Sequence, residues 1–503
     1  MNRKFEKYTD AETFAKIVDY SSVTEMWNHS VATYSNSIAI VDGKEYTYSE
    51  LDDEVSGFRT VFRENGVQPG SLVAVLCPNS VGFVKAFLAA ATYALPAVLL
   101  PAHLDANTIF GISYKFGLKA IVYDSSLADK VAIVKEKLPG VALIDSSASS
   151  NEKTPSIAPP AQTPCVFLFT GGTTGKSKAA RLSHGAVMAG TKNGCYGIKK
   201  IFGERYFLVL PLTHVFGLIR NLMTSLYTGS ALFICRNNKD MFRYIAVFKP
   251  TILVVVPALA EMALNLSHQF GRNMLGENMR TIICGAAPVP PYLVREYDKM
   301  GIALFPGYGL TESANLVSGN PEALSKPDSV GYIYGGMDYK IVDGELWIKG
   351  VNMMDGYATA EDNEIAYEDG YFKTGDLVKI DEEGFLYITG RTKEIIILSN
   401  GENVSPAEIE VKFYALDVVQ DCLVYDVNEN GKEMLVLEVL PRMSTVKALG
   451  IEDLYSYLKD EVAKINETLA PFERINKIVI RDTDFVRTPA MKIARNLNGN
   501  VKK

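Results

Sequence analysis

The sequence is poor in the residues that build small metal or disulfide sites. Its 503 residues include only five histidines, and the six cysteines form no C-x-x-C pair and stand apart from any histidine cluster. This scatter argues against both a disulfide framework and a zinc site. Cysteines that form no disulfide are typical of a reducing compartment, so we expect an intracellular location.

Excess positive charge and a clean apolar run are also missing. The net charge is −7, which argues against a nucleic-acid partner bound through its phosphates. The basic first residues are not followed by an apolar run, so they do not predict a secretory signal. The most apolar stretch, residues 83–104, is interrupted by Lys85, Pro96 and Pro101, which favours a buried helix followed by a strand over a membrane span. We therefore predict a cytoplasmic protein without a transmembrane segment.

Short β-branched runs alternate with helical stretches along the chain before residue 330. The runs most typical of strands are residues 71–77, 119–124, 250–257 and 280–285. Capping boxes predict helix starts at Thr47 with Glu50 and at Ser405 with Glu408, the second followed by Pro406. This alternation predicts βαβ units and parallel sheets, and hence an α/β fold.

The pattern of predicted secondary structure changes twice after residue 330. Short strands separated by glycine turns come first, which predicts antiparallel β structure. A new α+β pattern then runs to the end of the chain. The 503 residues also exceed the ~250–300 at which a single hydrophobic core stops growing, so more than one domain is expected. We predict an N-terminal domain over residues 1–390 and a C-terminal domain over 391–503. The joint near Lys393 is short, which favours a hinge over a flexible tether.

The stretch FTGGTTGKSKAARLSH, residues 169–184, has the composition of a loop that holds phosphate. The familiar Walker pattern needs a glycine five residues before Gly175. That position is Thr170, and Gly171 is one residue too close. The spacing therefore argues against a Walker-type NTPase, and a different phosphate loop must explain the stretch.

Four further motifs follow in order: GYGLTES (307–313), YFKTGDL (371–377), GRTKEIIILSNGENVSPAEIE (390–410) and RTPAMKIAR (487–495). Each alone is compatible with an ordinary turn, hairpin or solvated lysine. Together they resemble the adenylate-forming superfamily of acyl-CoA synthetases, adenylation domains and luciferases, with fatty acyl-CoA ligases the most similar group. The resemblance covers essentially the whole chain.

The resemblance implies a fold and a two-step reaction. The N-terminal domain would carry a small distorted β-barrel beside its βαβ sheets, and the C-terminal domain would be a mobile lid. A carboxylic acid would attack the α-phosphate of ATP in the presence of Mg²⁺, giving acyl-AMP and pyrophosphate. A thiol, that of CoA, would then take the acyl group and release AMP. Such phosphoryl chemistry depends mainly on positioning and charge neutralisation.

The matching motifs also imply individual roles. Lys492 would neutralise charge between the carboxylate and the α-phosphate, and Thr311 and His214 would complete the catalytic set. Glu312 would bind Mg²⁺, because this ion prefers hard oxygen ligands. Tyr308 would stack on adenine, and Asp376 with Arg391 would hold the ribose. The full set implied to bind ATP or AMP is Thr170, Gly171, Gly172, Thr173, Thr174, Gly175, Lys176, Lys178, Gly285, Ala286, Ala287, Tyr308, Gly309, Thr311, Asp376, Arg391 and Lys492.

The remaining implied sites concern the acyl group, CoA and the hinge. The acyl pocket would be bordered by His214, Val215, Phe216 and Gly217, and its depth would depend on helix 217–228 and on the segment 313–318. Asn400 and Gly401 would face CoA after the C-terminal domain rotates about Lys393. Aryl-acid activators often carry a polar residue where this chain has Val215, so we expect an aliphatic substrate.

Some positions depart from the family pattern and keep alternatives open. Gly171, Ser177 and Ala179 replace a more usual serine, proline and glycine, and Met491 stands where glycine would let the loop before Lys492 bend freely. The alternatives are a stand-alone adenylation enzyme loading a separate acyl carrier protein, an aryl-acid–CoA ligase, and a degenerate nucleotide-binding protein. The intact charged residues favour an active enzyme.

Overall fold

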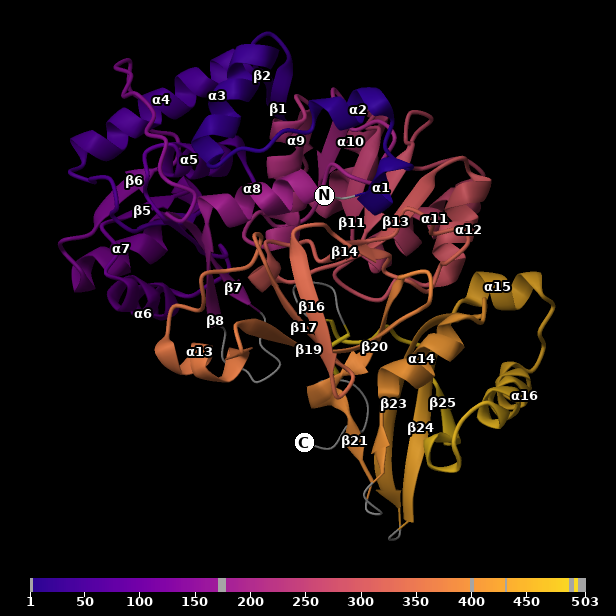
Figure 1. The fold of residues 1–503 in the computed structure, drawn as a ribbon. Helices are drawn as coiled ribbons and strands as arrows, with labels where there is room; N and C mark the ends of the chain where they lie inside the picture. Colours follow the sequence, from indigo (N-terminus) through magenta and orange to yellow (C-terminus); the bar gives the residue numbers. More distant parts are fainter. Residues whose placement is uncertain (1–2, 171–177, 399–401, 430–431, 488–492, 496–503) are drawn as a thin grey trace.

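The structure is a computed structural model and describes residues 3–170, 178–398, 402–429, 432–487 and 493–495. Two large sheets, parallel apart from their edges, form the N-terminal part of the molecule (Figure 1). The first has six strands in the order β6 (Ala142–Asp145), β5 (Ala120–Tyr123), β3 (Val73–Leu76), β4 (Ala97–Leu99), β7 (Pro164–Thr170) and β8 (Lys178–Ser183). Only the last pair, β7 and β8, is antiparallel.

The second sheet has nine strands and a parallel centre. Its order is β15 (Tyr332–Ile333), β14 (Ser318–Gly319), β13 (Ala303–Tyr308), β12 (Thr281–Cys284), β11 (Ile252–Val255), β9 (Arg205–Leu208), β10 (Ala231–Ile234), β1 (Ile38–Asp42) and β2 (Lys44–Thr47). The six strands from β13 to β1 run parallel, and antiparallel strands close both edges. The predicted α/β fold with parallel sheets is therefore confirmed.

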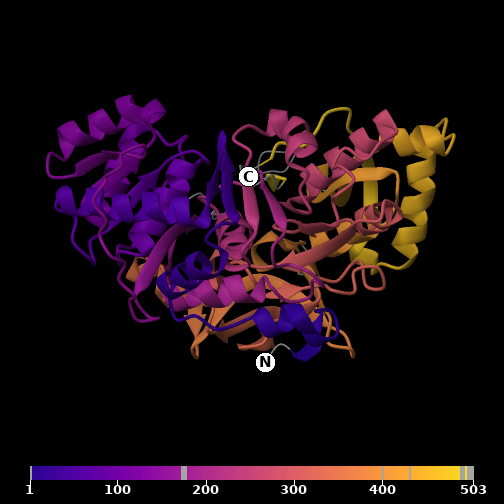
Figure 2. The same cartoon turned by 90° about the horizontal axis from the view of Figure 1, so that it is seen from above.

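Helices fill the space between the two sheets and cover their outer faces (Figures 1 and 2). Helix α5 contacts strands of both sheets, and its residues from Phe83 to Ala91 are all buried. The apolar stretch 83–104 is thus a buried helix followed by strand β4, as predicted. The main N-terminal helices are α3 (Val23–Tyr34), α4 (Tyr48–Glu64), α5 (Val81–Ala91), α6 (Ala106–Phe116), α7 (Ala128–Lys137), α8 (His184–Asn193), η2 (Phe216–Met223), α10 (Met241–Phe248), α11 (Pro257–Phe270) and α12 (Pro291–Lys299).

A five-stranded antiparallel sheet lies below the two large sheets in Figure 1. It contains β16 (Met337–Val342), β17 (Glu345–Gly350), β18 (Tyr367–Glu368), β19 (Tyr371–Ile380) and β20 (Leu386–Arg391). The antiparallel structure predicted after residue 330 is present. Strand β20 leads directly into the C-terminal part of the chain, so this sheet connects the two parts.

The C-terminal part has hydrophobic clusters of its own. It consists of β21 (Ile396–Ile397), β22 (Asn403–Val404), α14 (Pro406–Tyr414), β23 (Val419–Glu429), β24 (Lys432–Pro441), α15 (Met443–Ala448), α16 (Leu454–Glu467) and β25 (Ile475–Ile480). In the described part of the chain, no helix combines the length and the apolar character that crossing a bilayer requires.

The two predicted capping boxes differ in outcome. Thr47 and Glu50 exchange side-chain and backbone hydrogen bonds at the start of α4, as predicted. At α14 the helix does begin at Pro406, but Ser405 makes no side-chain cap bond. Its hydroxyl donates instead to the carbonyl of Thr389, 2.8 Å away. A tertiary contact with strand β20 therefore replaces the local bond.

Candidate active site

The predicted nucleotide-binding residues meet where two neighbouring strands end. Strands β12 and β13 pair in parallel, so the turn after Cys284 and the end of β13 at Tyr308 lie at the same edge of the sheet. A Cβ atom on Gly285 would lie 2.9 Å from the Gly307 carbonyl oxygen, which explains the glycine. The next residue, Ala286, has a positive φ of 66°, a conformation that is uncommon outside glycine.

Tyr308, Asp376 and Arg391 form one hydrogen-bonded group. The Tyr308 hydroxyl donates to Asp376 Oδ2 at 2.5 Å, and Arg391 Nε lies 2.7 Å from Asp376 Oδ1. Asp376 and Arg391 are register partners on β19 and β20. Burial raises the pKa of the Tyr308 hydroxyl well above its usual value, and the Asp376 carboxylate raises it further. Three residues from three separate motifs are thus in contact.

Glu312 lies beside this group on the short 3-10 helix η4 (Thr311–Ser313). Its Oε1 accepts a hydrogen bond from the Tyr357 hydroxyl at 2.6 Å. Its Oε2 makes no hydrogen bond or ion pair with another described residue. Burial raises the pKa of the Glu312 carboxyl and the Tyr357 bond lowers it, with burial prevailing. One carboxylate oxygen is therefore available for an outside partner.

The backbone around η4 is held tightly. Asn352 is fully buried and its amide donates to the carbonyls of Ser313 and Leu316, at 2.8 and 2.7 Å. The chain turns back after η4 so closely that a Cβ on Gly309 would lie 1.2 Å from the Asn315 carbonyl oxygen. No side chain other than hydrogen fits there, which gives Gly309 a structural reason besides its predicted role.

The ends of the predicted phosphate loop are fixed by the strands that flank it. Thr170 on β7 pairs with Lys178 on β8. Lys178 Nζ lies 3.1 Å from Asp362 Oδ1 and 4.8 Å from the centre of the Tyr357 ring, which brings it close to the Glu312 partner. The loop residues Gly171, Gly172, Thr173, Thr174, Gly175 and Lys176 lie outside the described residues.

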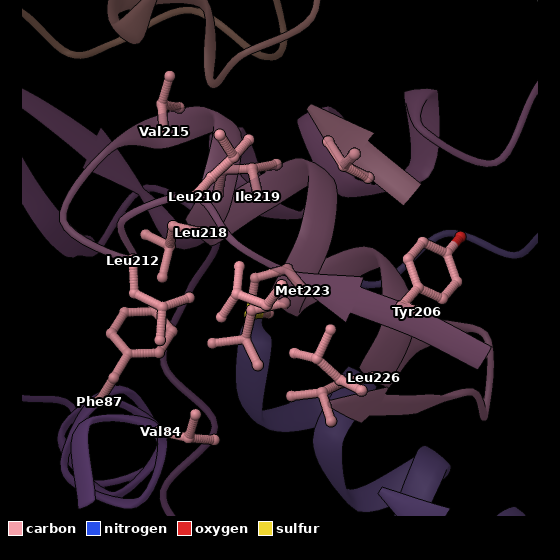
Figure 3. Close-up of a cluster of buried hydrophobic side chains, with 14 of the residues drawn as sticks. Val84, Phe87, Tyr206, Leu210, Leu212, Val215, Leu218, Ile219, Met223 and Leu226 are labelled. Atoms are coloured by element: carbon pink, nitrogen blue, oxygen red, sulfur yellow. The ribbon is translucent and has the colours of Figure 1, made fainter. Parts of the chain in front are cut away.

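The predicted acyl-pocket residues begin a π-helix, η2. Helices of this kind are rare and concentrate at functional sites. His214 precedes η2, and burial lowers the pKa of its imidazole, with His103 lowering it further. A Cβ on Gly217 would lie 2.3 Å from the Pro211 carbonyl oxygen, so the turn requires glycine. Side chains of η2, among them Leu218, pack with Phe87 of α5 (Figure 3).

The C-terminal predictions are described only in part. Lys393 lies in the single turn η5 (Thr392–Glu394) after β20. Asn400, Gly401 and Lys492 fall outside the described residues. The described residues on either side of Lys492 are paired: Arg487 pairs with Asp421, and Arg495 pairs with Glu410 and Glu394. Both arginines belong to the RTPAMKIAR motif.

Three contacting residues were not found from the sequence: Asn352, Tyr357 and Asp362. Tyr357 bonds to Glu312, Asp362 pairs with Lys178, and Asn352 holds the backbone that follows Glu312. They stand in the segment 352–362, which carries no spacing pattern typical of a nucleotide site. Only the tertiary structure brings Tyr357 to Glu312, Asp362 to Lys178 and Asn352 to the backbone after Glu312.

Comparison with known proteins gives consistent matches over most of the chain. A family model described as AMP-binding enzyme matches residues 27–358, and one described as AMP-binding enzyme C-terminal domain matches residues 393–499. A feruloyl-CoA synthase from an Amycolatopsis species is 28% identical over 420 residues, covering 78% of this chain and 84% of that protein. The oxalate–CoA ligase of Arabidopsis thaliana is 29% identical over 500 residues, covering 91% and 94%. The crystal structure of the anthranilate CoA ligase AuaEII with anthranoyl-AMP has a TM-score of 0.83 at 18% identity, covering 96% and 97% of the two chains.

Proposed function

The chain belongs to the AMP-binding enzyme family, and on that premise we propose that it activates an aliphatic carboxylic acid. It is an AMP-forming acid–CoA ligase. ATP with Mg²⁺ and the acid give an acyl-adenylate and pyrophosphate, and CoA then takes the acyl group. The resemblance stated from the motifs is thereby confirmed.

The group around Asp376 suits the nucleoside part of ATP. A carboxylate that already accepts from Tyr308 and Arg391 is fixed in one orientation, so it can accept from both ribose hydroxyls with little further loss of freedom. Arg391 beside it would donate to the same sugar, and Gly285 with Ala286 would border the adenine. These roles follow from the motifs, and the contacts among the residues support them.

Glu312 suits a magnesium ion. Its Oε2 has no partner among the described residues, and a carboxylate oxygen is a ligand that Mg²⁺ prefers. The Tyr357 hydrogen bond holds the carboxylate in place and favours its charged form. When bound, the ion would neutralise charge on the phosphates, and Lys178 lies close enough to contribute to the same effect.

The observation that carries the aliphatic assignment is the apolar residue after His214. Val215 is 9% exposed, and η2 beyond it contributes mainly apolar side chains. His214 is kept neutral by its lowered pKa, so it can border a carboxylate as a hydrogen-bonding group without adding charge. The feruloyl-CoA synthase among the relatives favours an aryl acid as the second candidate.

The two half-reactions would use two placements of the C-terminal domain. We assign residues 1–390 to the first domain and 391–503 to the second, with the hinge at Lys393. Lys492 would serve adenylation, and Asn400 and Gly401 would face CoA in the second step. The position of η5, directly after the strand that carries Arg391, supports a hinge there.

ATP–pyrophosphate exchange with a panel of acids tests the assignment. The panel contains straight-chain monocarboxylic acids, straight-chain dicarboxylic acids and hydroxycinnamic acids. Aliphatic acids should support exchange at least tenfold better than the aryl acids, and AMP release should then require CoA but no added protein. Preferential exchange with the hydroxycinnamic acids would favour the aryl alternative. AMP release only with an added acyl carrier protein would make the carrier the acceptor.

A further inference from the structure

A buried arginine in the π-helix η2 has no counter-charge among the residues that the structure describes. Arg220 is 4% exposed, and among the residues that the structure describes it forms no ion pair and its Nη1 has no hydrogen-bond partner. Its Nη1 is fully enclosed by protein. Buried arginines are almost always paired, because an uncompensated charge in the interior destabilises the fold. Arg220 therefore needs an explanation outside ordinary packing.

Arg220 lines a cavity of about 30 Å³, which holds about two water-sized groups. Leu316 and Ser318 also line it, so the cavity is bordered by both segments, 217–228 and 313–318, that the sequence predicts to set the depth of the acyl pocket. Gly307, directly before the predicted adenine-binding Tyr308, forms another wall. The cavity thus adjoins both segments that are predicted to set the depth of the acyl pocket.

The described residues around Arg220 offer no counter-charge. The cavity walls are mostly apolar and include Phe5, Ile283 and Phe305. Burial raises the pKa of the neighbouring Tyr206 hydroxyl and the Arg220 guanidinium lowers it, so that hydroxyl does not supply a negative charge at neutral pH. The hydroxyl also points away from the apolar cluster labelled in Figure 3.

We propose that Arg220 binds a second carboxylate, at the far end of an aliphatic dicarboxylic acid. This inference rests on the proposed function, since it assumes that the other carboxyl group of the acid is adenylated. A plain alkyl chain would leave the guanidinium buried beside hydrocarbon, whereas a distal carboxylate supplies the charge and the hydrogen-bond acceptors that the site lacks. The cavity has about the volume of one such group.

Paired substrates and a near-isosteric variant test the proposal. Wild type and Arg220→Met are compared in ATP–pyrophosphate exchange with monocarboxylic and dicarboxylic acids of equal length, from three to ten carbons. We expect wild type to use at least one dicarboxylic acid about tenfold or more better in kcat/KM than its monocarboxylic counterpart, as a charge-assisted bond would give. Arg220→Met should lose that preference and keep or gain activity with monocarboxylic acids, while Arg220→Lys should retain part of it.

The control is the thermal stability of the same proteins. Removing an unpaired buried charge should leave the Tm of Arg220→Met equal to or above that of wild type. A lower Tm together with equal losses for all acids would mean a structural role and overturn the proposal. So would a wild-type preference for monocarboxylic acids at every length, which leaves the proposed function standing. If no acid supports exchange, the proposed function fails, and the proposal is then decided by whether dicarboxylic acids raise the Tm of wild type but not of Arg220→Met.

Discussion

A buried arginine also joins the C-terminal part of the chain to the N-terminal part. Arg442, at the start of α15, donates from Nε and Nη2 to Glu261 Oε1 at 3.0 and 2.9 Å. Its guanidinium lies 3.6 Å from the centre of the Tyr292 ring. The two charged side chains are 6% and 8% exposed. Since Glu261 and Tyr292 stand on α11 and α12, this contact fixes one relative placement of the two parts (Figures 1 and 2).

The substitution Arg442→Met should weaken that placement strongly. It leaves the Glu261 carboxylate buried without a counter-charge. Burial already raises the pKa of the Glu261 carboxyl, and it is Arg442 and the Tyr292 hydroxyl that lower this pKa in the wild type. Breaking a buried ion pair in this way costs about 3–5 kcal/mol, roughly 150- to 5,000-fold in the docking equilibrium. We expect the C-terminal domain of the variant to undock, because undocking lets the carboxylate regain water.

Limited proteolysis of the joint, residues 391–398, measures this equilibrium under native conditions. When opening is fast compared with cleavage, the cleavage rate follows the open population, so Arg442→Met should be cut at least tenfold faster than wild type. The double variant Glu261→Leu with Arg442→Met should return to within about fivefold of wild type, since an apolar pair replaces a buried ion pair with little loss. The ratio of adenylation to thiolation rates should change in Arg442→Met and recover in the double variant.

An exposed ion pair at the same interface provides the matched control. Arg295 Nη2 lies 3.4 Å from Asp417 Oδ1, with side chains 47% and 64% exposed. Exposed pairs contribute about 0–1 kcal/mol, so Arg295→Ala should be cut within about fivefold of the wild-type rate. Equal cleavage of Arg442→Met and Arg295→Ala would refute the reasoning. So would a double variant that is cut as fast as Arg442→Met alone.

Three further variants test the site and the fold. Lys492→Ala should abolish adenylation and leave thiolation of supplied acyl-adenylate largely intact, and Lys393→Pro should do the reverse by blocking rotation. Equal loss of both steps in either variant would contradict the two-placement proposal. Tyr357→Phe should raise the Mg²⁺ concentration for half-maximal exchange about tenfold, because it removes a bond to Glu312; an unchanged Mg²⁺ dependence would exclude that role. Burial lowers the pKa of His184 to about 4, so the unfolded chain binds this proton below pH 6.5 and the folded chain does not. Unfolding free energy should therefore fall by about 3 kcal/mol between pH 7 and pH 4 and by that much less in His184→Gln, as urea unfolding would measure; an equal fall in both would refute it.

The parts of the fold that depend on local pattern could be read from the sequence. The β-branched runs became parallel strands, and the capping box at Thr47 formed as expected. Ser405 has the same local pattern and makes a different bond, because strand β20 presents a carbonyl within its reach. Local patterns therefore predict where elements begin better than they predict which partner a side chain takes.

The residues of the candidate site also fall into two groups, those that motifs predict and those that only the fold identifies. Tyr308, Asp376 and Arg391 stand in motifs whose order is visible in the sequence, and they meet in the structure. Tyr357 and Arg220 carry no such signal. Tyr357 matters because its hydroxyl donates to Glu312, and Arg220 because it forms no ion pair with a described residue. The absence of a partner is a property that only the folded chain has.

The nucleotide site and the predicted hinge are connected through consecutive contacts. Asp376 binds Arg391 across the β19–β20 register, and η5, with Lys393, follows at once. Glu394 in the same turn then pairs with Arg495, which flanks the segment of Lys492. A ribose held by Asp376 would thus be linked, through Arg391, to a strand end that lies two residues before the hinge. Loss of the nucleotide after the second step would relax that strand end, which gives a physical reason for the C-terminal domain to return then to the placement that serves adenylation.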